Sequence, residues 1–233
     1  MENIVIPRRS ILAVTLALSA TALWSGVAAA QGKPPSKELS SEEIAERVQA
    51  FYDKSRTFKA SFKQKYVVKA YAKTIDSKGQ VVFEKPGKMS WRYTTNGNRV
   101  VSDGKTIRVY EKENKQMFEQ PLNASQYPAA LSFLVGGAKL NKAFKFEEKP
   151  LDAKQMGFEG GYVLQGAPRD ATPSFDKILL YIDASTFQVT RVMLLDAQNN
   201  RNRFDFENPE VNTKVAPTEF NFTPPPGTHV VKP

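Results

Sequence analysis

The sequence predicts an α+β protein in which a single, strongly curved antiparallel β-sheet carries helices on its concave side. Hydrophobic and polar residues alternate over much of the chain, as from Phe58 to Tyr66, which is typical of half-buried antiparallel strands. Turn signals such as Asn96-Gly97 separate these runs at short intervals. The helical segments are few and very apolar, which favours lids over a sheet. No repeat or linker interrupts residues 40–233, so we expect one domain there.

The first 30 residues carry the pattern of a cleaved export signal. Arg8 and Arg9 form a positive amino-terminal region, residues 11–27 are mostly apolar, and Ala28-Ala29-Ala30 supplies a small-residue cleavage site. An apolar run of about 17 residues is marginal for a membrane span, so we predict a cleaved signal peptide at 1–30 rather than an anchor. The pair of arginines also partly matches a twin-arginine signal, which leaves the Sec and twin-arginine routes both open.

Residues 31–39 are expected to form a flexible lead-in to the domain. A helix should then begin, because Ser40 and Glu43 have the spacing of a capping box. Four apolar residues follow at helical spacing and form one stripe: Ile44, Val48, Phe51 and Tyr52.

The alternating segments predict about eleven strands in two groups. They lie at 58–66, 80–83, 89–93, 99–101, 106–110, 115–118, then 144–146, 161–164, 175–182, 188–195 and 203–206. Ser77-Lys78-Gly79 is predicted to turn the chain into the second strand. Phe220-Asn221-Phe222 is expected to be a last short strand, which the following Thr-Pro-Pro-Pro-Gly stops.

A short apolar element at residues 127–140 separates the two groups of strands. Pro128 suits the first position of a helix, and Gly136-Gly137 suits its end. Leu131, Phe133 and Leu134 make the element too apolar for a surface helix. We expect it to lie against the sheet, either as a core plug or as a lid.

The composition excludes several classes of protein. The chain has no cysteine, which excludes disulfides, cysteine nucleophiles, thiolate metal sites and, we expect, a lipobox anchor. The chain has a formal net charge of +9, of which residues 1–30 contribute +1, so cleavage after Ala30 leaves a net charge of +8 on 203 residues. Such a charge suits an anionic membrane surface or an acidic partner. Nucleic acid is disfavoured, because the lysines are scattered through strands rather than clustered.

No catalytic motif stands out. His229 is the only histidine and follows three prolines near the end of the chain. Asp103 is the best-placed acid, but Asp103-Gly104 is first of all a turn signal. Carboxylate chemistry stays open, because acidic pairs are common by chance. We therefore predict a binding protein that is not an enzyme and holds no cofactor or metal.

The aromatic content points to binding. After residue 30 the chain holds 24 aromatic residues, concentrated in strands. They would fill an ordinary core or a closed two-sheet sandwich. They would equally line an incompletely filled sheet interior that takes an apolar ligand such as an acyl chain. Met89, Met117 and Met193 suit a surface that repacks around variable chains, or simple core filling.

Several segments, taken in order, resemble a known family. The expected helix is followed by Phe58–Gln64, then by Lys-Pro-Gly-Lys-Met-Ser-Trp-Arg-Tyr at 85–93, by Val101–Tyr110, and by Phe220–Gly227. Each segment is weak alone. Their order, with the export signal and the absence of cysteine, resembles the periplasmic outer-membrane lipoprotein carrier protein LolA family over nearly the whole chain after residue 30.

This resemblance implies an open half β-barrel with a helical lid over its concave hydrophobic face. It implies a periplasmic, monomeric carrier of acylated lipoproteins. The cargo is released by an inner-membrane ABC transporter and delivered to an outer-membrane receptor lipoprotein. The family's Arg-Pro pair, whose arginine helps to hold the lid, falls on Lys85-Pro86. Lysine keeps the charge of arginine but lacks its planar fork of donors.

The expected acyl-chain cavity takes its lining from the apolar strands and the short apolar element: Phe62, Phe83, Met89, Trp91, Tyr93, Leu131, Phe133, Leu134 and Met193. Lys85 and Pro86 are the expected lid contact. Two other functions remain open. One is a periplasmic module of the same fold that senses lipoproteins or lipids. The other, less favoured, is a lipid-handling hydrolase.

Overall fold

The computed structural model describes residues 38–124, 131, 133, 134, 136 and 138–232. All of them belong to one compact unit, Glu38–Pro233. The predicted signal peptide, most of the lead-in and Pro128 lie outside the described residues. Leu39, expected in the flexible lead-in, packs against the hydrophobic core. The compact unit therefore begins slightly before the predicted residue 40.

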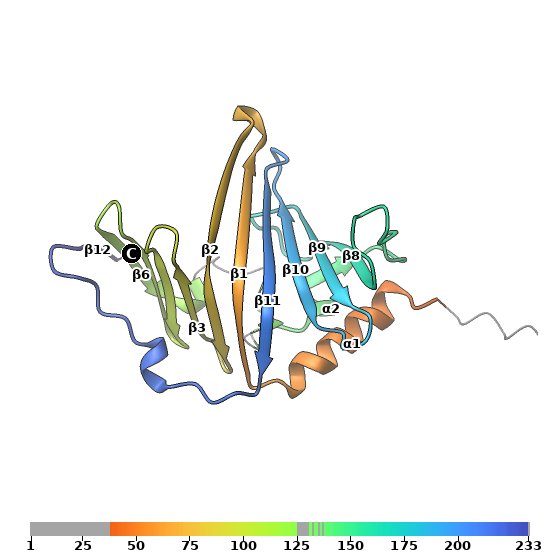
Figure 1. Ribbon diagram of the computed structural model, residues 1–233, viewed down its shortest axis with the longest axis horizontal. Coiled ribbons are helices and arrows are strands. Elements are labelled where there is room, and N and C mark those ends of the chain that lie inside the picture. The colour runs from red at the N-terminus through yellow and green to blue at the C-terminus, as the bar shows by residue number, and fades with distance from the viewer. Residues whose placement is uncertain (1–37, 125–130, 132, 135, 137, 233) are drawn as a thin grey trace, which may run out of the picture. The chain divides into compact units, whose positions relative to one another are not determined.

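Twelve strands form one open sheet in the order β12-β6-β5-β4-β3-β2-β1-β11-β10-β9-β8-β7 (Figure 1). Their bounds are β1 Thr57–Val68, β2 Lys73–Glu84, β3 Lys88–Tyr93, β4 Arg99–Asp103, β5 Thr106–Glu111, β6 Gln116–Pro121, β7 Phe144–Phe146, β8 Gly161–Pro168, β9 Lys177–Asp183, β10 Val189–Leu195, β11 Arg201–Val211 and β12 His229–Val231. The predicted single sheet is confirmed. It is mixed rather than purely antiparallel, because β12 pairs with β6 in parallel.

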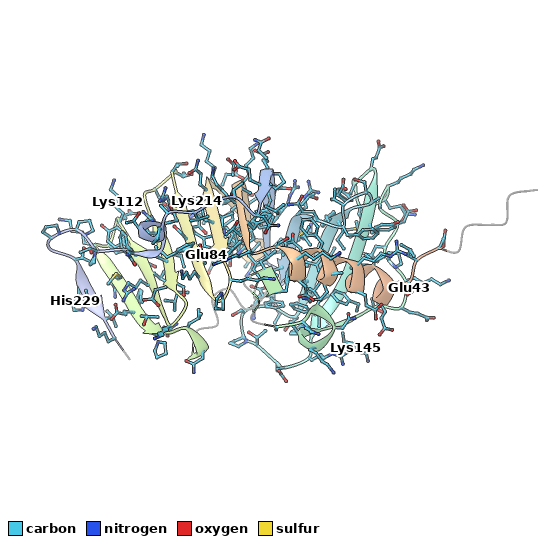
Figure 2. The ribbon with its side chains drawn as sticks, turned by 90° about the horizontal axis from the view of Figure 1, so that it is seen from below. Glu43, Glu84, Lys112, Lys145, Lys214 and His229 are labelled. Atoms are coloured by element: carbon cyan, nitrogen blue, oxygen red, sulfur yellow. The ribbon has the colours of Figure 1, made fainter. Side chains whose placement is uncertain are left out.

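Five helical segments accompany the sheet among the described residues. They are α1 Ser41–Lys54, α2 Leu140–Ala143 and the short 3-10 turns η1 Lys69–Tyr71, η2 Leu122–Ala124 and η4 Pro217–Phe220. The view from below shows α1 and α2 on the inner side of the curved sheet (Figure 2). The predicted position of helices on the concave side is thus observed.

The predicted capping box starts α1. The Glu43 N–H donates to Ser40 Oγ at 3.2 Å, and the Ser40 N–H donates to Glu43 Oε2 at 2.8 Å. These two bonds satisfy amide groups that have no partner within the helix. From this fixed start the apolar stripe faces the sheet, and Ile44, Val48 and Tyr52 are buried. Phe51, at the margin of the stripe, is half-buried.

Apolar side chains lie on both faces of the sheet. The main cluster joins α1 to the inner face of the strands, and alternation along each strand decides which residues enter it. A second, smaller cluster comprises Val163, Leu179 and Tyr181, with Met156 and Phe158 packed over them. It lies on the outer face, because neighbouring strand residues such as Leu164 and Leu180 belong to the main cluster.

The carboxy-terminal segment covers another part of the outer face. Phe220 of η4 is buried, and the Phe222 ring lies 5.4 Å from that of Tyr110. Arg92 forms an ion pair with Glu219, and the Arg99 guanidinium lies 5.2 Å over the Phe222 ring. The expected strand at 220–222 is therefore wrong. Its apolar-polar-apolar pattern instead belongs to an irregular segment that packs on the sheet. The last strand of the chain is β12, which follows the prolines.

The predicted turn at Ser77-Lys78-Gly79 is also wrong. These residues lie inside β2, and the chain turns earlier, at η1 and Ala72. Gly79 is needed because neighbouring atoms leave no room for a side chain at this position, not because the chain turns there. A Cβ at this position would lie 1.8 Å from the Arg92 carbonyl oxygen and 2.9 Å from Phe62 Cε1. Sequence alone does not distinguish a glycine of a turn from a glycine of a close approach.

No helix among the residues that the structure describes is long and apolar enough to cross a membrane.

Gly79→Ala should destabilise the protein strongly, because the new methyl group meets a backbone carbonyl that cannot move without its strand. We expect the free energy of unfolding to fall by about 2–4 kcal/mol, measured by urea denaturation. Ser77→Ala, two residues earlier in β2, is the matched control and should change it by about 0.5 kcal/mol or less. Equal stability of the two variants would contradict the close approach at Gly79.

Candidate functional site

The inner face of the sheet lies under α1 and under a covering segment described at Leu131, Phe133 and Leu134. Phe62, Phe83, Met89 and Trp91 of the sheet are each 1 % exposed. From the covering segment, Leu131, Phe133 and Leu134 are buried as well, and all seven belong to the main cluster. Tyr93 is half-buried and packs against this cluster. The structure thus brings together eight of the nine residues that the sequence assigned to one apolar site.

Met193 is the exception. It packs in the second cluster, against Val163, Leu179 and Tyr181 on the outer face. Its neighbours along β10, Val192 and Leu194, face the main cluster instead. Successive strand side chains point to opposite faces, so Met193 cannot share a cavity with Met89. Its place in the predicted lining is corrected, and Val192 takes it.

An aromatic cluster surrounds Trp91. The centroid of its ring lies 4.9 Å from that of Phe62, 5.8 Å from Phe83 and 5.4 Å from Phe204, all in edge-on arrangements. Phe206 follows at 6.4 Å. The predicted list lacked Phe204 and Phe206, although both lie in a predicted strand with the correct alternation. The indole N–H of Trp91 is buried and has no hydrogen-bond partner among the described residues.

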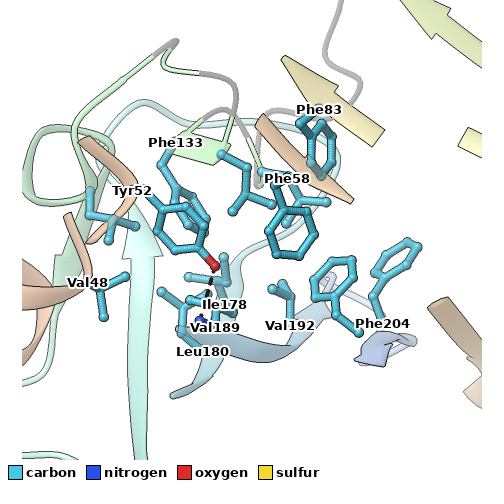
Figure 3. Packing of buried hydrophobic residues seen from close by; sticks show 14 of the residues in the cluster. Val48, Tyr52, Phe58, Phe83, Phe133, Ile178, Leu180, Val189, Val192 and Phe204 are labelled. Carbon is cyan, nitrogen blue, oxygen red and sulfur yellow. Dashed lines mark hydrogen bonds between the residues drawn. The ribbon is translucent and has the colours of Figure 1, made fainter. Parts of the chain in front are cut away.

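Tyr52 joins the helix to both the sheet and the covering segment (Figure 3). The Val189 N–H donates to Tyr52 Oη at 3.1 Å, inside the core. The Tyr52 ring lies edge-on to Phe133, with the centroids 5.2 Å apart, and also contacts Phe58. Burial raises the pKa of Tyr52 above its ordinary value, and the bond from Val189 opposes this only in part. The hydroxyl therefore stays neutral and serves as a structural acceptor.

Lys85 ties three segments together. It follows β2, and its Nζ donates to the Tyr52 carbonyl oxygen at 2.5 Å. Its aliphatic stem passes Gly136, where a Cβ would lie 3.2 Å from Lys85 Cδ. Burial lowers the pKa of Lys85, while the Asp53 carboxylate opposes that shift. A cation at the carboxyl end of α1 also meets the negative end of the helix dipole.

The two residues of the predicted lid contact thus differ. Lys85 hydrogen-bonds to the last turn of α1 and lies beside Gly136, two residues after Leu134. Pro86 is exposed in the turn between β2 and β3, and its carbonyl oxygen approaches Gly104. Of these two residues, the lysine makes the hydrogen bond to α1, and the role of both as a lid contact stays a prediction.

An apolar row runs from the buried cluster toward the sheet edge. Trp91, Val100, Val109 and Phe118 are successive cross-strand partners on β3, β4, β5 and β6. Trp91 is 1 % exposed, Val100 is 4 % exposed, Val109 is half-buried and Phe118 is 39 % exposed. The row therefore connects the covered interior to the surface. Sequence reasoning missed it, because register across four strands is not visible in the chain.

Asp103 is held by hydrogen bonds and by an ion pair. Asp103 accepts from the Lys105 and Thr106 amides at 2.9 and 2.8 Å and pairs with Arg108. Partial burial raises the pKa of Asp103, but these bonds outweigh burial and hold it below its ordinary value. This carboxylate fixes the turn that its Asp-Gly sequence predicted. Within the described ranges, no three His, Cys, Asp or Glu side chains gather as a metal site requires.

Residues 53–223 match the family described as outer membrane lipoprotein carrier protein LolA. The chain belongs to the LolA family. This match includes β1 to β11, Lys85 and η4, while β12 and most of α1 lie outside it.

The LolA family relatives are distant in sequence. An outer-membrane lipoprotein carrier protein of Bordetella avium is 28 % identical over 188 residues, which cover 80 % of this chain and 86 % of the relative. One from Nitrosomonas europaea is 26 % identical over 186 residues, covering 79 % and 87 %. An uncharacterized conserved protein from Thermus thermophilus matches in structure with a TM-score of 0.50 at 16 % identity, covering 82 % and 98 %.

Tyr52→Phe should destabilise this LolA family member, because it leaves the buried Val189 amide without an acceptor. We expect a loss of about 1–3 kcal/mol in the free energy of unfolding, measured by urea denaturation. Tyr162→Phe is the control, since the Tyr162 ring stacks on Phe187 and the change leaves that stacking in place. A Tyr52→Phe variant as stable as the control would show that the hydroxyl contributes nothing to stability.

Stability should fall at alkaline pH through Tyr52. The folded pKa is raised, so its contribution is complete below the unfolded value of about 10 and is lost as pH rises beyond it. The unfolded chain releases the proton there while the folded protein retains it. The stability difference between the wild type and Tyr52→Phe should therefore shrink by up to about 1.4 kcal/mol per pH unit. A constant difference above that pH would contradict a buried neutral hydroxyl.

Proposed function

We propose that the protein is exported to the periplasm and carries lipoproteins by enclosing their acyl chains between the sheet and its covering segments. It accepts cargo from an inner-membrane ABC transporter and passes it to an outer-membrane receptor lipoprotein. One observation carries the proposal. A chain of the LolA family holds its apolar inner face under a cover that Lys85 fastens at the carbonyl of Tyr52.

The cover consists of α1 and of the segment that contains Leu131, Phe133 and Leu134. It has to move for an acyl chain to enter. The sheet side chains beneath it are buried to 1 % exposure, so cargo replaces protein side chains rather than filling free space. Leu131, Phe133 and Leu134 occupy positions that acyl carbons would take. Each buried CH₂ contributes about 0.8 kcal/mol, but the displaced side chains lose their own burial. The net binding energy is therefore much smaller than the gross burial, and release stays feasible.

The fastening suits a cover that opens. Lys85 holds α1 through a hydrogen bond from one ammonium group to one carbonyl oxygen. An arginine would offer a planar fork of donors and a stronger hold. Burial already disfavours the Lys85 charge, so moving this side chain into water regains hydration and lowers the cost of opening.

The apolar row indicates how long chains fit. An acyl chain that starts beside Trp91 passes Val100 and Val109 and reaches Phe118 at the surface. Exposure rises along this path, so the glycerol end and the lipoprotein polypeptide remain in water. No covalent step is needed for binding or release.

Phe118→Glu should weaken binding of an acylated lipoprotein by about tenfold or more, because a carboxylate then stands where acyl carbons pass. The measurement is the fraction of a detergent-stripped lipoprotein that the purified protein keeps soluble. Val230→Glu is the matched control. Val230 is also 39 % exposed and lies on the neighbouring strand, but it pairs with Met117 and so faces the outer side.

A deacylated lipoprotein should show no binding in the same assay. Equal effects of Phe118→Glu and Val230→Glu would contradict the assigned path. Binding of acylated cargo without any release to outer-membrane vesicles would favour a lipoprotein sensor of this fold over a carrier.

Lys85→Met should make the cover open more often, because it removes the donor to the Tyr52 carbonyl and keeps the stem. We expect cargo to bind and leave faster, with a several-fold rise in fluorescence of a hydrophobic dye. Lys88→Met is the control, since Lys88 pairs with Glu84 at 2.9 Å and stacks over Phe220. If both variants bind the dye like the wild type, Lys85 does not fasten the cover.

A further inference from the structure

The β1–η1–β2 hairpin carries an exposed segment that the proposed carrier mechanism does not use. β1 and β2 extend beyond their neighbours at the end of the sheet opposite α1 (Figure 1). Residues 69–76, here called the hairpin tip, are all exposed. Tyr71 is 82 % exposed and Ile75 is 42 % exposed. Such side chains at a projecting turn stabilise nothing within the fold.

The tip is held in place by its neighbour. The Lys69 N–H donates to Asn200 Oδ1 at 2.9 Å, in the turn between β10 and β11. Asn200 is in turn fixed by Asp196, which accepts from the Asn200 amide at 2.9 Å and from its Nδ2 at 2.8 Å. Two hairpins are thus joined at one end of the sheet. Tyr71 is presented from a braced turn rather than from a loose loop.

Positive charge surrounds the tip. Residues 63–78 contain five lysines and one aspartate, and residues 196–203 contain two arginines and one aspartate. Lys63 pairs with Glu207 and Lys65 with Asp76. Lys69, Lys73 and Lys78 form no ion pair within the described part of the chain. The net charge of these two segments is +5, of which Lys63 and Arg203 are offset by Glu207 and Asp205 just outside them.

We infer that the hairpin tip is a docking surface for an anionic lipid bilayer. Tyr71 has Lys69 and Lys73 two residues before and after it. This combination suits the membrane interface, where aromatic rings lie at the level of the headgroups and ammonium groups contact the phosphates. Each lysine or arginine near an anionic leaflet raises binding by about fivefold. A protein partner fits less well, because lysine is depleted from protein interfaces.

The position of the tip links docking to the apolar site. Tyr66 and Ile75 are direct cross-strand partners. Both lie two strand steps from Gln64 and Ser77 and four from Phe62, on the inner face. The membrane contact therefore continues along β1 into the covered cluster. The purpose of this contact, delivery of acyl chains at a bilayer, rests on the proposed function, but the contact itself does not.

Vesicle sedimentation tests the inference. The protein is expressed with its own leader, and its processed form is identified by intact mass. We expect it to bind vesicles that contain phosphatidylglycerol and to release them as salt is raised, since screening weakens surface charge. Binding to pure phosphatidylcholine vesicles should be weaker by about tenfold or more. Failure to bind phosphatidylglycerol vesicles at low salt would overturn the inference.

Charge reversals show whether the tip is responsible. Lys69→Glu with Lys73→Glu should weaken binding to phosphatidylglycerol vesicles by about tenfold or more. Lys105→Glu with Lys214→Glu changes the net charge equally at exposed sites near the opposite end of the sheet. It should weaken binding by about threefold or less. If both double variants lose the same binding, the loss comes from net charge alone, and the hairpin tip is not the docking surface.

The absence of cysteine allows the contact to be located. Tyr71→Cys and, as control, Lys105→Cys each give one labelling site for an environment-sensitive dye. The Tyr71→Cys label should shift to the blue on addition of phosphatidylglycerol vesicles, and the Lys105→Cys label should not. The reverse pattern would overturn the inference. Intact vesicle binding with lost cargo binding in Phe118→Glu would separate this surface from the carrier function.

Discussion

The burial of the sheet's inner face beneath α1 and beneath Leu131, Phe133 and Leu134 is the interaction on which the rest of the structure depends. Phe58, Phe62, Phe83 and Trp91 form an apolar surface on an open sheet, and no second sheet closes over it within the described residues. Water would make such a surface costly. The chain covers it with one amphipathic helix and one short apolar segment, and these join the sheet at Tyr52.

Tyr52 shows that the cover is held to the sheet by a few hydrogen bonds together with apolar packing. Its hydroxyl accepts a buried backbone amide from β10, and its carbonyl accepts the Lys85 ammonium group from the turn after β2. Contacts from both halves of the sheet therefore converge on the last turns of one helix. A few directed bonds position the cover, while non-directional apolar packing supplies most of the burial. Packing of that kind has no fixed direction, unlike the hydrogen bonds that position the cover.

The outer face obeys a different constraint. It is covered by two separate segments, with Phe158 over Tyr181 on one side and Phe222 over Tyr110 on the other. Ion pairs such as Lys63–Glu207 lie between them on the long central strands. The same strands thus carry the main apolar cluster on one side, and a smaller apolar cluster together with ion pairs on the other. Their projecting ends add a charged tip where both sides meet solvent.

The sequence by itself determined what depends on neighbours along the chain. The capping box at Ser40, the apolar stripe of α1 and the alternation of β1 are local patterns, and the structure has them. The membership of Phe62, Met89 and Trp91 in one apolar cluster follows from the same alternation. The resemblance of ordered segments also identified the family, because each segment keeps its place in the chain.

Only the tertiary structure decided what depends on pairing between distant segments. The place of Gly79 inside β2 follows from the approach of the Arg92 carbonyl on the next strand. The face of Met193 follows from the register of β10 against β9 and β11. The parallel pairing of β12 and the fastening of Lys85 at Tyr52 likewise join residues far apart in sequence. Spacing along the chain carries no information about such contacts, since strand register and side-chain reach are set by packing.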